Sequence, residues 1–334
     1  MALLKSQIDL LKSKLIPGTS VVLVPHKGPD GDAMGSVLAL WLYLKKIEIN
    51  AHVIIPDEYP GFLAWLPGNE SVINYYLNRK TASAIISEAS IIFHVDHNDV
   101  ERTGQMSEDL KKSSAMRVLL DHHRDAVLKP DISLHNPDSS ATAELIYYLI
   151  TGMSGPDAID KDIATCIFTG IMTDTGCFSY NSSYPELYNV IEALLLKGID
   201  KDYIYGKVYD NFSADRMRLL GDCLRRMEVL PEHNAAIMSL SLEEQKVFSF
   251  VTGDAEGFVN YPLSIKGIKF SVFFTEKENC IRISFRSRGS FAVNDFAAKY
   301  FNGGGHTNAA GGESFLSLPE TIDYFKKCLI EFTS

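Results

Sequence analysis

The chain has 334 residues, of which 46% are hydrophobic and 22% charged, and its net charge is −10. This length favours two domains over a single core, and the acidic balance argues against a partner that is bound through a long track of phosphates. No apolar run is long enough to span a membrane. The first segment reads as an amphipathic helix without an export signal, and the five cysteines show no paired spacing. We therefore expect a cytoplasmic protein.

The first half of the chain alternates between strand-like and helix-like segments. The strand-like runs are short and apolar and cover residues 21–25, 51–56, 89–96 and 116–123. The helical patterns cover residues 32–46, 140–150, opened by Ser139 or Ser140, and the first part of 161–178. Such alternation predicts βαβ units and a mainly parallel sheet. Ligands of open parallel sheets bind at the carboxyl ends of the strands, so polar residues at those ends are candidates for a site.

The pattern changes after residue 185. Residues 185–227 are helical and charged, and their later part is a candidate connector. Alternating runs then predict strands at 234–242, 268–277 and 280–289, before a glycine-rich loop at 301–312 and a last helix at 319–332. We expect an α/β fold with an N-terminal domain, mainly a parallel sheet with flanking helices, and a smaller C-terminal α/β domain. The expected limits are 1–205, a helical connector at 206–230, and 231–334.

Acidic and imidazole side chains collect where the predicted strands and helices end. They are His26, Asp30, Asp32, Asp96, Asp121, His122, His123 and Asp174. One Asp in a loop is more often a cap or a solvated turn residue, and a lone His is more often structural. Here, however, separate segments deliver such residues to one expected edge. Burying that many carboxylates without cations would cost several kcal/mol each, so the pattern indicates a metal centre.

The donor set predicts which cations would bind. Carboxylates with a few imidazoles and no thiolate suit Mn²⁺, Mg²⁺ or Fe²⁺ better than structural Zn²⁺. There are more carboxylates than one ion needs, whereas two ions about 4 Å apart with a shared carboxylate would use them all. Asp30 and Asp32 lie two residues apart with no Lys or Arg between them. Two such charges repel unless a proton or cation intervenes, so each could face a different ion.

Four segments resemble the motifs of the DHH phosphoesterase superfamily. They are HKGPDGDAMGS at 26–36, HVDHND at 94–99, LLDHHRDA at 119–126 and TGIMTDTGCFSY at 169–180. The stretch RSRGSFAVNDFAAKYFNGGGHTNAAGG at 286–312 resembles the accessory DHHA1 domain. Within the superfamily, the compact size and the pairing of the two domains are most similar to the NrnA type. Members of that type are bifunctional oligoribonucleases that also remove phosphate from 3′-phosphoadenosine 5′-phosphate.

The resemblance implies two divalent ions, most simply Mn²⁺, and it implies which residues bind each ion. The implied ligands are His26 and Asp30 for one ion, Asp32, His122 and Asp174 for the other, and Asp96 as the bridge. A water activated between the ions would attack phosphorus. Asp121 would orient its neighbour, and His123 would touch a phosphate oxygen or assist the leaving group.

The resemblance also implies residues that hold the substrate. Arg102 would support the loop after Asp96 or the site itself. In the C-terminal domain, Arg286 and Ser287 would take a phosphate or ribose. The glycines Gly303, Gly304 and Gly305 would let backbone N–H groups approach an anion, and His306 completes this GGGH motif. The structural alternatives are a surface arginine and an ordinary turn.

The implied function is that of an Mn²⁺-dependent phosphoesterase acting on short oligoribonucleotides and on 3′-phosphoadenosine 5′-phosphate. A cyclic dinucleotide phosphodiesterase is the alternative among enzymes, and a catalytically silent nucleotide-binding regulator is the alternative of another class. Pyrophosphatase, exopolyphosphatase and long single-strand exonuclease activities are less favoured. We expect no membrane partner and leave a homodimer open. His97 departs from the usual motif, and its role is open.

Overall fold

The computed structural model describes residues 2–124 and 126–333. Asp125, which belongs to the DHH-like motif at 119–126, lies outside the described residues. The chain divides into two compact units, Met1–Asn211 and Phe212–Ser334. The division expected from the sequence, with a connector at 206–230, stays a prediction. The conformation of residues 214–230 is described with the second unit.

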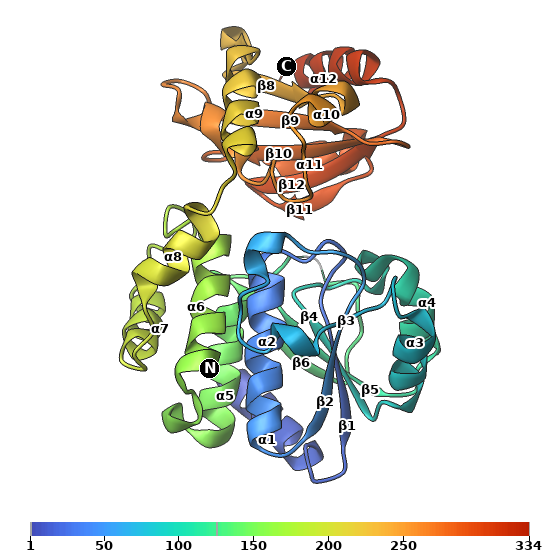
Figure 1. Cartoon of the computed structure of the whole chain (residues 1–334), viewed down its shortest axis with the longest axis vertical. Helices are drawn as coiled ribbons and strands as arrows, with labels where there is room; N and C mark the ends of the chain where they lie inside the picture. Colours follow the sequence, from blue (N-terminus) through green and yellow to red (C-terminus); the bar gives the residue numbers. More distant parts are fainter. Residues whose placement is uncertain (1, 125, 334) are drawn as a thin grey trace. The chain divides into compact units, whose positions relative to one another are not determined.

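The first unit is built on a six-stranded sheet in which every pairing is parallel, as expected (Figure 1). Its order is β3-β2-β1-β4-β5-β6. The strands are β1 (Ser20–Val24), β2 (Asn50–Ile55), β3 (Ile73–Asn74), β4 (Ile91–Val95), β5 (Met116–Asp121) and β6 (Ile132–His135). The sequence pattern did not predict β3 or β6. Both are short edge strands, and β6 alternates between buried and exposed residues instead of forming a continuous apolar run.

Helices cover both faces of this sheet (Figure 1). One layer contains α1 (Ala2–Lys14), α2 (Gly31–Lys46), α5 (Thr142–Ser154), α6 (Lys161–Asp174), α7 (Pro185–Leu195) and α8 (Lys201–Tyr209). The other layer contains α3 (Arg79–Glu88) and α4 (Ser107–Lys112). Alternate residues of β1 serve the two layers, because Val21 and Leu23 pack with the first and Val22 and Val24 with the second.

The strand order places a topological switch next to β1. The chain runs from β1 outward to β2 and β3 and then returns to β4 on the other side of β1. The connections that leave the carboxyl ends of β1 and β4 therefore diverge, and such a point is where open parallel sheets bind ligands. The segments after these two strands carry His26 and Asp96.

The second unit has a six-stranded sheet of order β11-β12-β10-β9-β8-β7. Only the β8–β9 pairing is parallel among the described strands of this sheet. Its strands are β7 (Glu228–Leu230), β8 (Ala235–Leu240), β9 (Phe270–Glu276), β10 (Ile281–Ser287), β11 (Gly304–His306) and β12 (Ala309–Ser314). Its helices are α9 (Ala214–Arg225), α10 (Leu242–Val247), α11 (Val293–Tyr300) and α12 (Leu318–Thr333). A phenylalanine cluster, including Phe270, Phe285, Phe296 and Phe325, fills its core.

The structure adds detail to one expectation for this region and corrects another. Within the expected connector, α9 packs its apolar face, Leu219 and Leu220, with Met238 and Phe273 of the second sheet, and residues 228–230 form an edge strand. The glycine-rich stretch is not a plain loop, because Gly304–His306 and Ala309–Ser314 pair as an antiparallel hairpin. Glycine-rich sequence suggested a loop, whereas the strands form through backbone hydrogen bonds that need no side chains.

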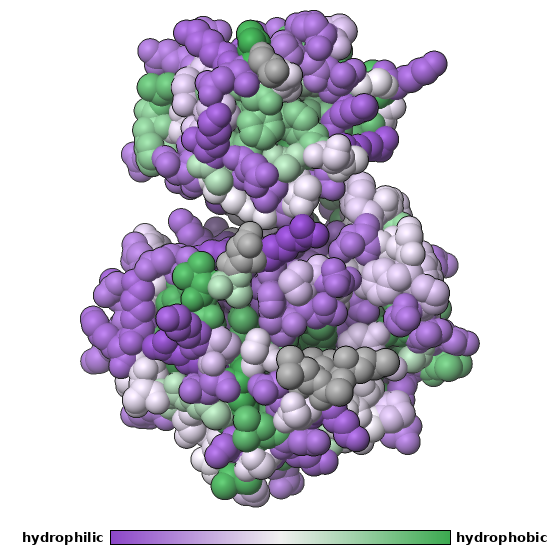
Figure 2. All heavy atoms as spheres, turned by 180° about the vertical axis from the view of Figure 1, so that it is seen from behind, coloured by the Kyte–Doolittle hydropathy of each residue, from purple (hydrophilic) through white to green (hydrophobic). Residues whose placement is uncertain are grey.

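Short 3₁₀ helices complete the fold. They are η1 (Gly61–Leu63), η2 (Asn69–Ser71), η3 (Val100–Met106), η4 (Pro156–Ala158), η5 (Pro231–His233) and η6 (Phe258–Ser264). On the face seen in Figure 2, hydrophilic residues are spread over both units with smaller hydrophobic patches among them. Among the described residues, no helix combines the length and apolar character that crossing a membrane requires.

Candidate metal centre

The segment between β1 and α2 carries the first group of polar side chains. Asp30 caps α2, because its Oδ1 accepts hydrogen bonds from the backbone N–H groups of Asp32 and Ala33, each at 3.0 Å. Its other oxygen, Oδ2, lies 3.8 Å from Nε2 of His26. The cap therefore fixes the carboxylate and leaves one oxygen facing the imidazole.

Asp96 follows β4 and lies at the centre of the group. Its side chain is buried, and its backbone has φ of +59°, a left-handed conformation that is uncommon for a residue other than glycine. Oδ2 lies 3.5 Å from Nε2 of His26, and Oδ1 lies 3.7 Å from Nε2 of His122. The two oxygens of one carboxylate thus face two different imidazoles. Burial disfavours the charge, but the hydrogen bond from His26 and the charges of the surrounding histidines hold the pKa of Asp96 well below its usual range.

Asp32 is buried in the first turn of α2 and faces the start of α5. Its Oδ2 accepts from the backbone N–H of Thr142 at 2.7 Å, and its Oδ1 accepts from that of Ala143 at 2.9 Å. Ser36 adds a hydroxyl bond at 3.2 Å. Burial, followed by the charges of Asp96 and Asp174, raises the pKa of Asp32 well above its usual value. The site therefore holds more negative charge than it can keep ionised without cations.

Close contact between α2 and α6 brings Asp32 near Asp174. A Cβ at Gly170 of α6 would lie 2.9 Å from Oδ1 of Asp32, and one at Gly31 would lie within 2.7 Å of three side-chain atoms of Thr173. Small residues at these positions allow the start of α2 to lie beside the end of α6. Asp174 is the last residue of α6, so the helix covers the first part of 161–178, as the sequence predicted.

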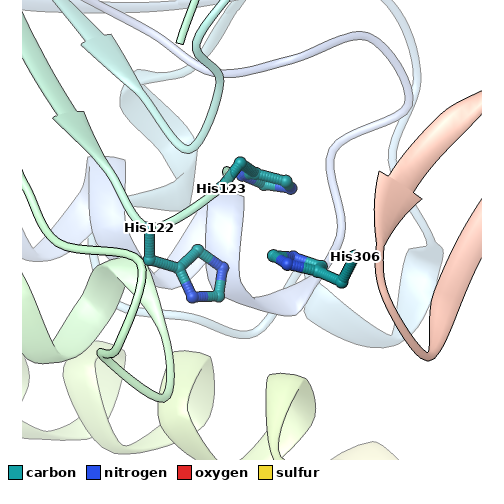
Figure 3. Close-up of side chains that lie close together, drawn as sticks. All are labelled: His122, His123 and His306. Atoms are coloured by element: carbon teal, nitrogen blue, oxygen red, sulfur yellow. The ribbon is translucent and has the colours of Figure 1, made fainter. Parts of the chain in front are cut away.

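The end of β5 supplies the DHH segment. Figure 3 shows the rings of His122 and His123, whose centroids are 5.0 Å apart at an interplanar angle of 76°. Nε2 of His122 lies 3.4 Å from Oδ2 of Asp174 and 3.9 Å from Oδ2 of Asp32. Nδ1 of His123 lies 2.7 Å from Oδ1 of Asp121. The two adjacent histidines therefore share Asp96, whose Oδ1 lies 3.7 Å from Nε2 of His122 and 3.6 Å from Nδ1 of His123, but each has a further carboxylate of its own.

The pKa values of this segment follow from its surroundings. Burial opposes the charge of His122, but the carboxylates of Asp174, Asp96 and Asp32 raise its pKa to about 9. Burial, followed by the charge of Asp96, raises the pKa of Asp121 to about 7. Burial lowers the pKa of His123 to about 3. His123 is therefore neutral at neutral pH, and because Nδ1 faces Asp121, the lone pair is on Nε2.

The expected residues of the first unit come together in three groups. Two of them share Asp96, and in the remaining one Nε2 of His122 lies 3.7 Å from Oδ1 of Asp96. In each group, one ligand atom from every member lies within 4.8 Å of the others. The groups are His26, Asp30 and Asp96; Asp32, His122 and Asp174; and Asp96, Asp121 and His123. All eight Asp and His positions expected from the sequence of this unit therefore belong to one site.

The donor set and burial of these groups fit divalent cations. Oxygen and nitrogen donors predominate and no thiolate is among them. Asp32, Asp96 and Asp121 are buried, and without cations the pKa values of Asp32 and Asp121 are raised. Burial is the first cause of these raised pKa values and repulsion between the carboxylates the second, and two cations would offset both. The first two groups could each hold one ion, since Asp96 has one oxygen toward each.

Arg102 lies on η3, and its backbone carbonyl accepts a hydrogen bond from the N–H of Lys27 at 2.7 Å. This bond joins the segment after β4 to the segment after β1. The guanidinium charge contributes to lowering the pKa values of Asp121 and His123. Among the described residues it takes part in no ion pair. A half-buried, unpaired cation near the carboxylates is available for an anionic ligand.

His97 lies in a buried histidine pair. Its Nδ1 lies 3.1 Å from the carbonyl oxygen of Val95, and its Nε2 lies 3.0 Å from Nδ1 of His94. Burial lowers the pKa of His97, and it lowers that of His94 to about 4, so the pair is neutral. Both ring nitrogens of His97 have partners, and it belongs to none of the three groups.

The residues of the second unit that were expected to bind substrate differ in the hydrogen bonds that they already make. Arg286 lies on β10, where its guanidinium bonds the carbonyl oxygen of Phe285 at 3.0 Å. Ser287 is buried, its hydroxyl donates to the carbonyl oxygen of Phe291 at 2.6 Å, and it accepts from Asn308 at 2.8 Å. Because this donor is already used, a phosphate could gain no hydrogen bond from Ser287, whereas a donating ribose hydroxyl still could.

The three consecutive glycines have different surroundings. A Cβ at Gly303 would lie 2.0 Å from the carbonyl oxygen of Gly311, and one at Gly305 would lie 2.5 Å from that of Ala309. Close packing of the hairpin therefore explains these two glycines. Gly304 is exposed and has open space around its Cβ position, so an external ligand could approach its backbone. His306, also drawn in Figure 3, ends β11.

Sequence reasoning missed residues at the start of α5. Thr142 and Ala143 contact Asp32, and the Thr142 hydroxyl donates to Oδ1 of Asp96 at 2.9 Å. Neither expected serine caps this helix, since the N-cap is Ala141 and the serine hydroxyls bond Glu144 instead. The signal in the sequence was a run of small polar residues before a buried glutamate.

Family models match both units of the chain. Residues 20–171 match the DHH family, N-terminal domain, and residues 244–333 match the DHHA1 domain. A solved structure described as an exopolyphosphatase-related protein from Bacteroides fragilis is 42% identical, with a TM-score of 0.93, and the match covers 98% of this chain and 96% of that one.

Among the curated relatives with named activities, two differ in what they act on. The "Bifunctional oligoribonuclease and PAP phosphatase NrnA" of Thermus thermophilus is 26% identical over 87% of this chain and 83% of its own length. The "Cyclic-di-AMP phosphodiesterase GdpP" of Bacillus subtilis is 24% identical over 96% of this chain, but the match spans only 49% of GdpP.

Proposed function

The chain belongs to the DHH family of phosphoesterases, and a DHHA1 domain follows the DHH domain in the sequence. On this basis we propose that it cleaves short oligoribonucleotides to mononucleotides. The same site would convert 3′-phosphoadenosine 5′-phosphate to AMP. The observation that carries the proposal is Asp96, whose two oxygens face His26 at 3.5 Å and His122 at 3.7 Å. One carboxylate between two ligand groups suits a pair of cations acting on a phosphate ester.

Each ligand group has a proposed place at the centre. One ion would be held by His26, Asp30 and Asp96, and the other by Asp32, His122, Asp174 and Asp96. Mn²⁺ is the proposed metal, with Mg²⁺ or Fe²⁺ as alternatives, because the donors are carboxylates and imidazoles. When bound, such a pair lowers the pKa of water and stabilises negative charge that develops on a phosphoryl group.

Residues around the ligands would handle the phosphate. His123 has Nδ1 held by Asp121 at 2.7 Å, so in its neutral ring Nε2 carries the lone pair. Once a phosphate ester is bound, this nitrogen would contact the scissile group or assist proton transfer to the leaving oxygen. Arg102 would compensate the negative charge of the substrate.

The second unit would recognise the rest of a nucleotide. Arg286 offers a cation, and the exposed Gly304 offers backbone that a ligand could approach. Gly303, Gly305 and His306 would shape this hairpin edge, and the position of Ser287 favours a contact with ribose over one with phosphate. Such contacts recognise one or two nucleotides, which supports a preference for short substrates. The net charge of −10 gives a longer polymer little further attraction.

A hydrolysis panel tests this proposal. The purified chain with Mn²⁺ is assayed on RNA dimers to 24-mers, 3′-phosphoadenosine 5′-phosphate, cyclic dinucleotides and pyrophosphate. We expect RNA of two to about five residues to be cleaved faster than the 24-mer, with a shallow salt dependence. Asp32→Asn, prepared in the same way, controls for contaminating nucleases. A kcat/KM that rises steadily up to the 24-mer would instead indicate a processive exonuclease.

The relative GdpP favours one second candidate, a cyclic dinucleotide phosphodiesterase. Preferential hydrolysis of cyclic di-AMP in the panel would establish it. Metal binding without turnover of any substrate would instead support a catalytically silent nucleotide-binding regulator.

A further inference from the structure

One short segment at the start of α5, residues 139–144, contacts three of the proposed metal ligands. Its backbone N–H groups at Thr142 and Ala143 bind the carboxylate of Asp32 at 2.7 and 2.9 Å. The Thr142 hydroxyl donates to Asp96 at 2.9 Å. Further contacts from this segment reach the DHH motif, so it touches ligands that come from three different parts of the chain.

The contact with the DHH motif determines the state of an imidazole. Nδ1 of His122 lies 3.2 Å from the carbonyl oxygen of Ser139. A carbonyl only accepts, so Nδ1 carries a proton, and Nε2 is the nitrogen that faces Asp174 at 3.4 Å. Partners of this kind orient metal ligands and set their basicity.

Glu144 holds the segment in this conformation. Its side chain is buried, and Oε2 accepts from the hydroxyls of Ser139 at 2.6 Å, Ser140 at 3.1 Å and Tyr184 at 2.5 Å. The backbone N–H of Ser140 adds a bond at 2.9 Å, and the Tyr148 hydroxyl reaches Oε1 at 3.3 Å. Among the described residues, Glu144 forms no ion pair. Neutral donors alone therefore hold a buried carboxylate, a costly arrangement that ties several segments together.

These contacts serve the site as well as the core. Glu144 binds both serines before α5, so the segment turns and directs the free N–H groups of the first helical turn at Asp32. α5 has 13 residues, and the positive end of its dipole favours the negative charge of that carboxylate. The Thr142 hydroxyl occupies one lone-pair direction of Asp96 Oδ1, which limits the directions left for a cation.

We propose that Glu144 is a positioning residue of the metal centre. Through residues 139–143 it orients Asp32, Asp96 and His122 for cations, without touching metal or substrate itself. This inference rests on the ligand assignment in the proposed function.

The test measures metal affinity directly, by calorimetric titration of the full-length metal-free chain with Mn²⁺. Glu144→Gln keeps the size of the side chain but removes its charge, so a neutral amide oxygen would have to accept the four bonds that Oε2 now accepts and would hold them less strongly. We expect its Kd for Mn²⁺ to rise about 10- to 100-fold, the usual effect of losing an outer partner of a metal ligand. The same loss should appear in kcat more than in KM.

Asp109→Asn is the matched control. Asp109 also accepts two hydroxyl bonds, from Tyr75 at 2.7 Å and Ser83 at 2.5 Å, but it lies in the α3–α4 layer. We expect it to lower the thermal midpoint of the metal-free chain while leaving the Kd for Mn²⁺ unchanged. If both variants lose stability but only Glu144→Gln binds Mn²⁺ more weakly, the loss of stability does not explain the loss of affinity.

Thr142→Val and Thr142→Ser decide the question if Glu144→Gln does not fold. The valine removes only the hydroxyl bond to Asp96, and we expect weaker Mn²⁺ binding, whereas the serine keeps the bond and should bind as the wild type does. Wild-type affinity in Glu144→Gln, or in Thr142→Val when that variant decides, would overturn the inference. A wild type that binds Mn²⁺ but cleaves no substrate would overturn the proposed function alone, and a wild type that binds no Mn²⁺ would overturn both.

Discussion

A Cβ atom at Gly35 of α2 would lie 2.5 Å from the backbone carbonyl oxygen of Cys166 in α6. The two helices therefore meet backbone to backbone at this point, since only a hydrogen fits between them. Gly35 follows Asp32 by about one turn of α2, and α6 ends at Asp174. The separation of these two carboxylates thus depends on helix packing as well as on loop conformation.

Gly35→Ala should push α2 and α6 apart. Overpacking of this kind costs about 1–3 kcal/mol of unfolding free energy, and the displacement should also weaken Mn²⁺ binding. Denaturant unfolding and metal titration measure the two effects. Gly221→Ala is the control, because Gly221 of α9 has open space at its Cβ position and alanine favours a helix. Unchanged stability and metal affinity in Gly35→Ala would show that the helices adjust freely.

Asp96→Asn should lower kcat by orders of magnitude while the fold survives. The change removes the charge proposed to be shared by both ions and keeps the size of the side chain. Turnover of an RNA dimer under saturating Mn²⁺ is the measurement, with circular dichroism to check folding. The exposed Asp138, changed to Asn, should retain full activity. Near-normal turnover by Asp96→Asn would rule out the bridging role.

Removal of metal should abolish turnover and lower thermal stability. A ligand that binds only the folded state at a hundredfold excess over its Kd contributes about 2.7 kcal/mol. For a unit of this size the loss corresponds to a fall in Tm on the order of 5–10 °C. Calorimetry with and without chelator measures the shift, and added Mn²⁺ should restore it. Asp174→Asn, which lacks one proposed ligand, should show a smaller shift. Equal Tm values with and without chelator in the wild type would contradict the prediction.

Gly304→Ala should raise KM and leave the hairpin intact. The position has open space for a methyl group, so the change adds bulk where a phosphate or ribose would approach the backbone. We expect KM to increase several-fold with the Mn²⁺ affinity unchanged. Gly303→Ala differs, because its methyl group would collide with Gly311 and should reduce stability. If Gly304→Ala bound substrate like the wild type, this edge of the hairpin would not be a substrate contact.

The sequence by itself determined the fold class and the chemistry of the candidate site. Buried parallel strands are continuous apolar runs that can be recognised in the sequence, and their carboxyl ends must lie at the same edge of the sheet. For this reason the polar residues at the ends of 89–96 and 116–123, and those that follow 21–25, could be assigned to one site from the sequence. The mainly apolar helical patterns of α2 and α6 were equally local signals.

Only the tertiary structure decided how that site is assembled. Asp30 and Asp32 are neighbours in sequence, yet one faces His26 and the other receives N–H groups from α5, 110 residues away. The role of Glu144 and the reason for Gly303 and Gly305 depend on contacts between distant segments. Such contacts leave no periodic pattern in the sequence, because packing and hydrogen bonds join whichever residues the fold brings together.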